Sequence, residues 1–387
     1  MWYFQAPTVV YGEDALSHLS TLEGTRALIV TDANMAKLGV VDRIRQPLED
    51  GGFAVEVFAE VEPDPDTETV SRAAEKARDF GADWIIGLGG GSPLDAAKMV
   101  RVLAERPDLT PQDVNPIVPM GLTNAVRLCT IPTTSGTGAE AGWACIITDR
   151  AEKRKLVLGS RDAFPDVAIV DPALAAGMPP WLTADTGMDA LVHAIEIYTG
   201  SWHNDYVDGP ALMSIRLVFD YLPRAYRDGS DMEAREKMAN AATLAGFGLA
   251  NANIGLAHAL AHSLGGVFHP PHGRTTCVFL PYTMQFCIKD APERYADIAR
   301  FLGLPGETDA ERAQALIEAV QQLQVEVGQP QDVRSLKIPE DQFHAEMDHL
   351  VASAEADATM FTSPRVPDSA EVARLFEYAY QGRAIDF

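Results

Sequence analysis

The sequence predicts an α/β protein in two parts: an N-terminal doubly wound parallel sheet of the Rossmann-like kind, followed by an all-α C-terminal domain. Up to about residue 180, short β-rich runs alternate with amphipathic stretches, which is typical of a parallel sheet covered by helices. Beyond that point the strand signals stop, and Ala-, Leu- and Met-rich helical patterns continue to Phe387. The length of 387 residues also suits about two domains. We expect them at residues 1–179 and 180–387.

Five apolar runs are predicted as the strands of the sheet. Their residues are largely aliphatic, as expected for parallel strands that are covered on both faces. In chain order they are 26–32 (RALIVTD), 53–60 (FAVEVFAE), 83–91 (DWIIGLGGG), 127–134 (RLCTIPTT) and 167–172 (VAIVDP).

Helices are predicted between these strands and throughout the C-terminal part. Residues 33–52 form one helical pattern, and residues 66–82 form a second that begins at an Asp or Thr cap and ends at Gly81. The longest helical pattern runs over residues 232–266, and its many Ala and Gly residues would let neighbouring helices approach closely. Residues 329–342 are predicted to form a surface loop.

Composition narrows the class of partner. A net charge of −24 argues against binding nucleic acid or an anionic membrane, because clustered Lys and Arg capture both. The N-terminal stretch MWYFQAPTVVYGEDAL lacks the basic and apolar regions of a signal peptide, and no segment approaches about 18 uninterrupted apolar residues. We therefore expect a cytoplasmic protein. The cysteines, which form no C-x-x-C pair and are expected to be buried and reduced, are Cys129, Cys145, Cys277 and Cys287.

Two Gly-rich loops follow predicted strands. Residues 84–98 (WIIGLGGGSPLDAAK) place three glycines and a serine between a strand and a helix, where exposed N–H groups can bind phosphate. This pattern is neither G-x-G-x-x-G nor a P-loop, so a tight structural turn is an equal alternative. Residues 131–140 (IPTTSGTGAE) end another strand with hydroxyls and glycines. Together the loops favour a nucleotide site, because open α/β sheets bind ligands at carboxyl strand ends.

Asp32 ends the first strong β-run, at 26–32. Its carboxylate could accept hydrogen bonds from a ribose diol and would repel a 2′-phosphate, which favours NAD(H) over NADP(H). The alternative is a helix N-cap, a common position for Asp.

Histidines are concentrated in residues 255–273 (GLAHALAHSLGGVFHPPHG), which hold four of the nine in the chain. His258 and His262 stand four apart and so share one face of a helix, and His272 follows a Pro-Pro pair that must break that helix. A metal site, a proton relay and a polar helix junction could each produce this pattern.

A second pair of polar side chains adds to this inventory. In GMDALVHAIE, Asp189 and His193 stand at i and i+4, where a simple hydrogen bond within the helix is the alternative to a ligand pair. With His258 and His272 the set becomes one carboxylate and three imidazoles, which suits Fe(II) or Zn(II).

These motifs together resemble the iron-containing (group III) alcohol dehydrogenase family, and the likeness runs nearly from end to end. It rests on GGGSPLDAAK, IPTTSGTGAE, VAIVDPAL, TGMDALVHAIE and GLAHALAHSLGGVFHPPHG, in the family's order and approximate spacing. Metal-free relatives that reduce maleylacetate lack the full ligand set, so the intact quartet argues against that branch.

The resemblance implies roles for individual residues. The implied metal ligands are Asp189, His193, His258 and His272, and His262 is implied to lie beside the substrate without binding the metal. With Asp32, the implied cofactor-binding residues are Gly89, Gly90, Gly91, Ser92, Asp95, Lys98, Thr133, Thr134, Thr137 and Lys155.

The function implied is that of an NAD-dependent alcohol dehydrogenase or aldehyde reductase containing iron, or alternatively zinc. Hydride would pass between a small alcohol or aldehyde and the nicotinamide, and a homodimer is the implied assembly. Related glycerol dehydrogenases and dehydroquinate synthase share the architecture. The synthase needs basic residues for a phosphate-bearing substrate, and the region near the histidines offers only Arg274 and Lys289. A non-catalytic metal or nucleotide binder is the alternative outside the enzymes.

Overall fold

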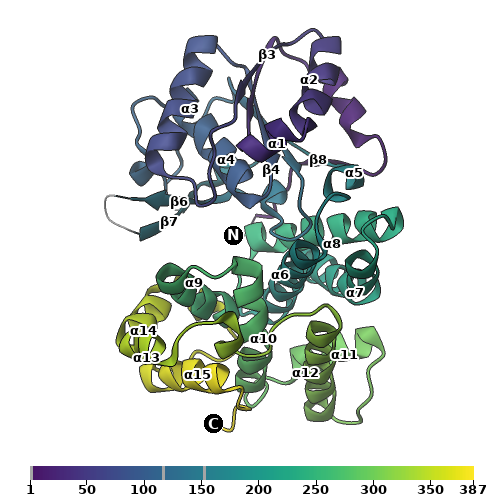
Figure 1. Ribbon diagram of the computed structural model, residues 1–387, viewed down its shortest axis with the longest axis vertical. Coiled ribbons are helices and arrows are strands. Elements are labelled where there is room, and N and C mark those ends of the chain that lie inside the picture. The colour runs from purple at the N-terminus through teal and green to yellow at the C-terminus, as the bar shows by residue number, and fades with distance from the viewer. Residues whose placement is uncertain (1–2, 116–117, 151–153) are drawn as a thin grey trace. The chain divides into compact units, whose positions relative to one another are not determined.

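A computed structural model describes residues 3–115, 118–150 and 154–387 of the chain. The chain divides into two units, Met1–Gly177 and Met178–Phe387, two residues before the boundary inferred from the sequence. Within the described residues, all the strands lie in the first unit, and the second unit is built from helices (Figure 1).

The first unit is built around a six-stranded sheet with strand order β1-β8-β5-β4-β2-β3, in which all neighbours run parallel. Alternate residues of one strand serve opposite faces: Leu28 packs into one apolar cluster and Ile29 into another. Burial on both faces confirms the predicted doubly wound sheet. Its strands are β1 (Thr8–Tyr11), β2 (Arg26–Val30), β3 (Ala54–Phe58), β4 (Trp84–Gly89), β5 (Arg127–Pro132) and β8 (Val167–Val170).

The helices of this unit agree with those predicted from the sequence, except that one predicted helix is broken in two. The predicted helix over 66–82 is α3 (Thr67–Phe80), capped by Asp66 and ended by Gly81, as expected. The single helix predicted over 33–52 is wrong. It is divided into α1 (Ala33–Lys37) and α2 (Val40–Asp50) because Gly39 adopts a left-handed φ of 71°. The remaining helices and 3₁₀ turns are α4 (Gly91–Glu105), α5 (Pro172–Ala175), η1 (Ala15–Thr21), η2 (Pro111–Asp113), η3 (Ala139–Ala141) and η4 (Arg161–Ala163).

The sequence analysis missed three strands. One is β1, a four-residue strand at the edge of the sheet. The others form an antiparallel hairpin of β6 (Ala144–Asp149) and β7 (Arg154–Gly159). In β6 buried and partly buried residues alternate, but its sequence, ACIITD, has no alternation of apolar and polar residues that could have predicted the strand.

The second unit is helical, as predicted, but its longest predicted helix is wrong. Residues 232–266 fall into two helices, α8 (Met232–Asn251) and α9 (Leu256–Phe268), which meet at 95°. The other helices and turns of the unit are α6 (Pro180–Thr199), α7 (Asp205–Arg227), α10 (His272–Cys287), α11 (Glu293–Leu302), α12 (Asp309–Glu326), η5 (Arg334–Leu336), α13 (Glu340–Ala345), α14 (Met347–Ala356), η6 (Ala358–Thr362) and α15 (Ser369–Gln381).

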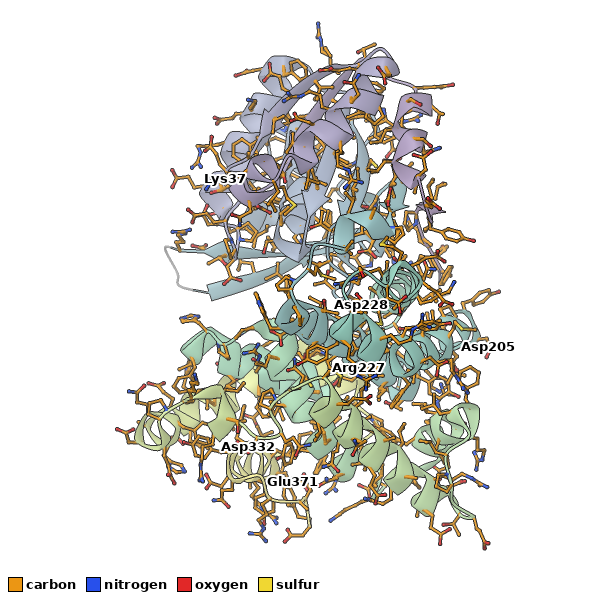
Figure 2. The ribbon with its side chains drawn as sticks, turned by 45° about the vertical axis from the view of Figure 1, so that its right-hand side comes forward. Lys37, Asp205, Arg227, Asp228, Asp332 and Glu371 are labelled. Carbon is orange, nitrogen blue, oxygen red and sulfur yellow. The ribbon has the colours of Figure 1, made fainter. Side chains whose placement is uncertain are left out.

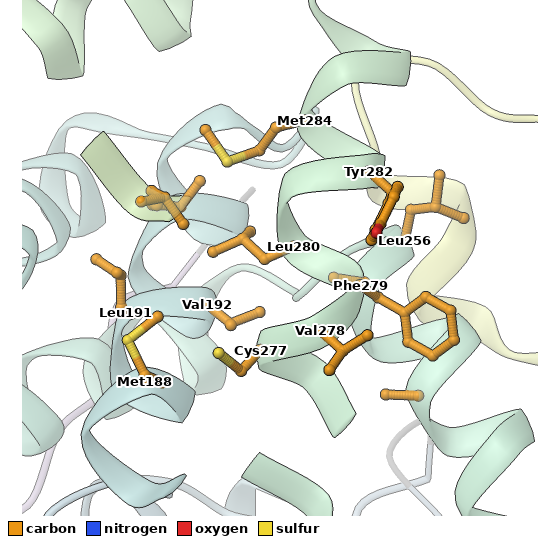
Figure 3. Packing of buried hydrophobic residues seen from close by; sticks show 14 of the residues in the cluster. Met188, Leu191, Val192, Leu256, Cys277, Val278, Phe279, Leu280, Tyr282 and Met284 are labelled. Atoms are coloured by element: carbon orange, nitrogen blue, oxygen red, sulfur yellow. The ribbon is translucent and has the colours of Figure 1, made fainter. Parts of the chain in front are cut away.

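The core of this unit takes residues from most of its helices, and within it α10 packs against both α6 and α9. Met188 and Val192 of α6 face Cys277 and Leu280 of α10, and all four side chains are buried (Figure 3). This core holds the helices that carry the predicted ligands. All four cysteines of the chain are buried and unpaired, as expected, and burial raises the pKa of each thiol.

Charged side chains cover the surfaces of both units (Figure 2). Lys37, Asp205, Arg227 and Asp228 are exposed examples. In the described ranges no single helix is long and apolar enough to cross a membrane. The bent pair α8 and α9 meets that test only by its combined length and composition.

Candidate functional site

The first unit has a topological switch point between β2 and β4. The chain passes from β2 to β3 on one side and then crosses to β4 on the other side of β2. Neighbouring loops diverge at such a point and leave a crevice at the carboxyl ends of the strands. Asp32 follows β2, and residues 89–92 span the end of β4 and the start of α4. The structure therefore brings both sequence motifs to one place.

The glycine loop is both a tight turn and an uncapped helix start. Gly89 has a φ of 142°, and a Cβ there would lie 2.7 Å from Pro93 Cγ. Gly90 is the N-cap of α4 and offers no side-chain hydrogen bond to the first turn. The N–H groups at the start of α4 are thus available to an anion. The tight turn is confirmed at Gly89, and phosphate binding at the helix start stays a prediction.

The second loop packs against the first. Thr133 N donates to Gly89 O over 2.9 Å. A Cβ on Gly90 would lie 3.6 Å from the side chain of Thr134, and one on Gly91 would lie 3.2 Å from Thr137 Cγ2. The hydroxyl-bearing residues after β5 therefore line the glycine loop after β4.

Asp32 is an N-cap, the alternative role inferred for it. Its Oδ1 accepts from Asn34 N at 2.7 Å and from Met35 N at 3.1 Å. Its Oδ2 points to the glycine loop, because a Cβ on Gly89 would lie 3.4 Å from it. One oxygen caps α1, and the other faces the crevice.

Asp95 and Lys98 contact the β6–β7 hairpin. Lys98 Nζ donates to Asp95 Oδ1 at 3.1 Å and to Ala144 O at 2.7 Å, and Ile146 N donates to Asp95 Oδ2 at 3.0 Å. Lys98 is 1% exposed, and burial raises the pKa of Asp95. The pair joins α4 to β6. Lys155 lies opposite Thr148 in β7, and its side chain lies outside the described part of the structure.

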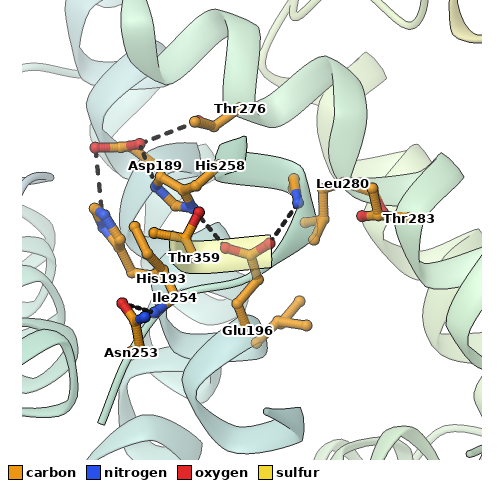
Figure 4. A network of polar contacts seen from close by, with 12 residues as sticks. Asp189, His193, Glu196, Asn253, Ile254, His258, Thr276, Leu280, Thr283 and Thr359 are labelled. Atoms are coloured by element: carbon orange, nitrogen blue, oxygen red, sulfur yellow. Dashed lines mark hydrogen bonds and ion pairs between the residues drawn. The ribbon is translucent and has the colours of Figure 1, made fainter. Parts of the chain in front are cut away.

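The second unit brings the predicted metal ligands together from three helices. Asp189 lies on α6, His258 on α9 and His272 at the start of α10, and one ligand atom of each lies within 4.8 Å of the others. The Nε2 atoms of His258 and His272 lie 3.9 and 3.6 Å from Asp189 Oδ1. His193 is outside this group of three, although its Nδ1 lies 3.9 Å from Asp189 Oδ2 (Figure 4).

The distances between these nitrogen and oxygen atoms fit ligands that share one cation better than they fit direct hydrogen bonds. The donor atoms are too far apart to bond each other, whereas ligands on one metal at about 2.1 Å lie roughly 3–3.5 Å apart. Among the described residues, the buried His258 Nε2 and His193 Nδ1 find no hydrogen-bond partner. Such orphaned atoms need a partner that protein groups do not supply. The donor set of one carboxylate and imidazoles suits Fe(II) or Zn(II).

Charge in this cluster matches a metal site. Burial, then neighbouring His193, lowers the pKa of His258 well below its usual value, so the ring is neutral and can act as a ligand. Burial alone would raise the pKa of Asp189, but the surrounding imidazoles and the Thr276 hydroxyl outweigh it and lower that pKa. The carboxylate is thus kept ionised in a buried position.

Two residues that the sequence analysis did not assign support the ligands from behind. Thr276 Oγ1 donates to Asp189 Oδ1 at 3.0 Å. Glu196 Oε2 lies 2.5 Å from His258 Nδ1. Burial raises the pKa of Glu196 to about 7. Hydrogen bonds from the N–H groups of Gly255 and Ala257 lower this pKa but do not outweigh burial. Glu196 stands at i+7 from Asp189, so helical spacing places both on one face of α6 but does not show that Glu196 meets His258.

His262 lies beside the ligand cluster on α9. Its Nδ1 is 2.7 Å from Asp357 Oδ2, and its ring stacks on that of His272 with centroids 5.4 Å apart. Burial alone would raise the pKa of Asp357, but hydrogen bonds from His262 and Thr359 outweigh it and lower the pKa to about 2. Asp357 is 95 residues away in the chain, and no sequence signal pointed to it.

Family models match both units. The model for iron-containing alcohol dehydrogenase covers residues 6–172, and the model for the C-terminal part of the Fe-containing alcohol dehydrogenase family covers residues 183–380. The chain belongs to the iron-containing alcohol dehydrogenase family. This confirms the resemblance seen in the sequence.

Individual family members are similar over nearly their whole length. The NADPH-dependent butanol dehydrogenase of Clostridium saccharobutylicum is 39% identical over 381 residues, 98% of each chain. A solved 1,3-propanediol oxidoreductase has a TM-score of 0.93 at 34% identity and covers 98% of this chain and 100% of its own. Sulfoacetaldehyde reductase from Bifidobacterium kashiwanohense, solved with NAD⁺, has a TM-score of 0.87 at 27% identity over 98% of both chains.

Membership of this family establishes the general activity. The chain is an NAD(P)-dependent oxidoreductase of alcohols and aldehydes, with an iron site and a nucleotide site. The reaction class predicted from the sequence is thereby confirmed.

Proposed function

We propose that this iron-containing alcohol dehydrogenase transfers hydride between NAD(H) and a small alcohol or aldehyde, with the metal held by Asp189, His193, His258 and His272. The observation that carries the proposal is the buried His258 Nε2, which has no hydrogen-bond partner in the described structure and faces the Asp189 carboxylate. The first unit would hold the nucleotide and the second the metal and substrate oxygen.

The protein groups have separate tasks in this proposal. When bound, Fe(II), or Zn(II) as the alternative, supplies a Lewis acid for the substrate oxygen. The Asp189 carboxylate supplies the negative charge among neutral imidazoles. His262 is placed to pass the proton that alcohol oxidation releases and aldehyde reduction consumes.

A substrate panel tests the proposal directly. Protein reconstituted with iron is mixed with alcohols and NAD⁺, or with aldehydes and NADH, and nicotinamide absorbance is followed. We expect turnover with short-chain substrates in both directions. Retained metal with no turnover on any member of the panel would contradict the proposed substrate class.

Asp32 is expected to set the preference for NAD(H). Its Oδ2 faces the glycine loop, where a carboxylate binds a ribose diol and repels a 2′-phosphate. Asp32→Ser keeps an N-cap side chain, and Asp32→Gly costs only a few tenths of a kcal/mol at a cap, so both variants should fold. Each should raise the ratio of kcat/KM for NADPH to that for NADH, measured with one aldehyde. A wild-type enzyme that prefers NADPH would contradict this assignment.

Substitutions at Gly90 and Gly89 are expected to have different effects: the first should weaken phosphate binding and the second should destabilise the turn. Gly90→Ala adds a methyl group in ordinary contact with Thr134, so stability should fall by about 1 kcal/mol or less, and we expect the methyl at the N-cap to hinder an anion at the helix start. NADH affinity should fall about tenfold or more, the cost of one charged hydrogen bond. Gly89→Ala should instead lose about 1–3 kcal/mol of stability through backbone strain. Calorimetric titration measures the NADH affinity, and urea unfolding measures the stability. Unchanged NADH binding by Gly90→Ala would mean that the glycine loop serves only as a turn.

We also propose a cytoplasmic homodimer without a nucleic-acid or membrane partner. The family likeness supports the dimer. The net charge of −24 supports the absence of polyanionic partners.

A further inference from the structure

Glu196 is a buried carboxylate that connects two helices of the metal-binding unit. It lies on α6, two turns after Asp189, and its side chain is 8% exposed. One oxygen, Oε1, accepts from Ala257 N at 2.6 Å, and the other, Oε2, lies 2.5 Å from His258 Nδ1 (Figure 4). A single side chain of α6 therefore contacts both the backbone and a predicted ligand of α9.

The start of α9 depends on this carboxylate. The N-cap of α9 is Gly255, which supplies no side-chain hydrogen bond, so the first-turn N–H groups need an acceptor from elsewhere. Glu196 supplies it and places negative charge at the positive end of the helix dipole. A Cβ on Gly255 would lie 3.0 Å from Glu196 Oε1, which explains why the α8–α9 break ends at a glycine.

The same contact decides which nitrogen of His258 carries the proton. Glu196 Oε2 is the hydrogen-bond partner of Nδ1, and Nε2 has none, so the arrangement in which the carboxylate accepts places the imidazole proton on Nδ1. The Nε2 lone pair is then left toward Asp189 Oδ1, 3.9 Å away, where a metal ligand is needed. An acceptor behind a ligating histidine fixes its tautomer and ring orientation.

We propose that Glu196 is a positioning residue for the metal, which acts by holding His258 as its Nδ1–H tautomer and by fixing the first turn of α9. The inference rests on the metal site proposed above. Glu196 does not touch the metal or the substrate, and its effect passes through His258.

Glu196→Gln tests the tautomer with almost no change of shape. The amide oxygen can still accept from Ala257 N, but the amide NH₂ then faces His258 Nδ1 and donates to it. The imidazole proton moves to Nε2, where it blocks metal binding. A flipped amide would place its NH₂ against the Ala257 N–H and lose that hydrogen bond. We expect the dissociation constant for Fe(II) or Zn(II) to rise about 10–100-fold, the usual effect of losing such a partner.

The control is Asp66→Asn, which makes the same carboxylate-to-amide change at a buried N-cap. Asp66 Oδ1 accepts from Thr69 N at 2.7 Å at the start of α3, in the other unit. We expect its metal dissociation constant to equal that of the wild type. Metal binding is measured with Zn(II) alone, by competition with a chelating dye in slightly alkaline buffer. Glu196→Asp keeps an acceptor and should recover part of the affinity.

A second measurement avoids any variant. Nitrogen NMR of the metal-free wild-type protein, labelled in its histidines, should show His258 protonated on Nδ1. Protonation on Nε2 would overturn the inference, as would a Glu196→Gln variant that binds Zn(II) as tightly as the wild type. A wild-type protein that binds no metal would instead overturn the proposed metal site itself.

Discussion

His258→Ala is expected to abolish both metal retention and catalytic activity while the chain remains folded. The ring is fully buried, its Nε2 is the unpartnered atom facing Asp189, and its Nδ1 is fixed by Glu196. Removing a ligand should lower metal affinity by more than the 10–100-fold loss that follows removal of a partner behind one. Elemental analysis after desalting measures the metal, and circular dichroism checks the fold.

The matched control for this variant is His349→Ala, which removes an exposed histidine from the same unit. It should retain metal and activity. Asp189→Ala and His272→Ala should behave like His258→Ala. The loss of Asp189 leaves a dication held by neutral imidazoles alone. Full metal occupancy in any of the three would mean that the ligand set is misassigned.

The second large effect is expected for His262→Ala, in which kcat should fall by about 10² or more, the lower range for a positioned acid–base group. The metal should stay bound, because the ligand atoms belong to other residues. Asp357 accepts from His262 Nδ1 at 2.7 Å and so leaves Nε2 as the available nitrogen, and the side chain is 26% exposed. A histidine held in this way can exchange a proton with water. Steady-state kinetics and metal analysis measure these two properties.

His344→Ala is the matched control, because His344 also contacts a carboxylate, Glu377, at 2.9 Å, but on the exposed surface. Its kcat should equal that of the wild type. Metal loss in His262→Ala would make His262 a ligand or a support for one. An unchanged kcat would remove it from the proton path.

Local sequence pattern was enough to predict the fold class and the two ends of α3. Apolar runs of strand length alternate with amphipathic helices, and this pattern depends only on which residues each segment must bury. The cap at Asp66 and the end at Gly81 are likewise local, because they depend on the chemistry of one or two residues. The identity of the family was readable from motifs in their order along the chain.

The support of the metal cluster depends on which helices pack against each other. Periodicity predicts which face of a helix is buried but not which other helix meets that face, so Glu196 behind His258 and Asp357 behind His262 were not assigned. The break before α9 has a local and a tertiary part. Asn251, Asn253 and Gly255 are poor helix formers, and the α6 carboxylate caps the new helix start at Gly255. A buried carboxylate and helix N–H groups stabilise each other only when packing brings them together, because neither can be left buried without a partner.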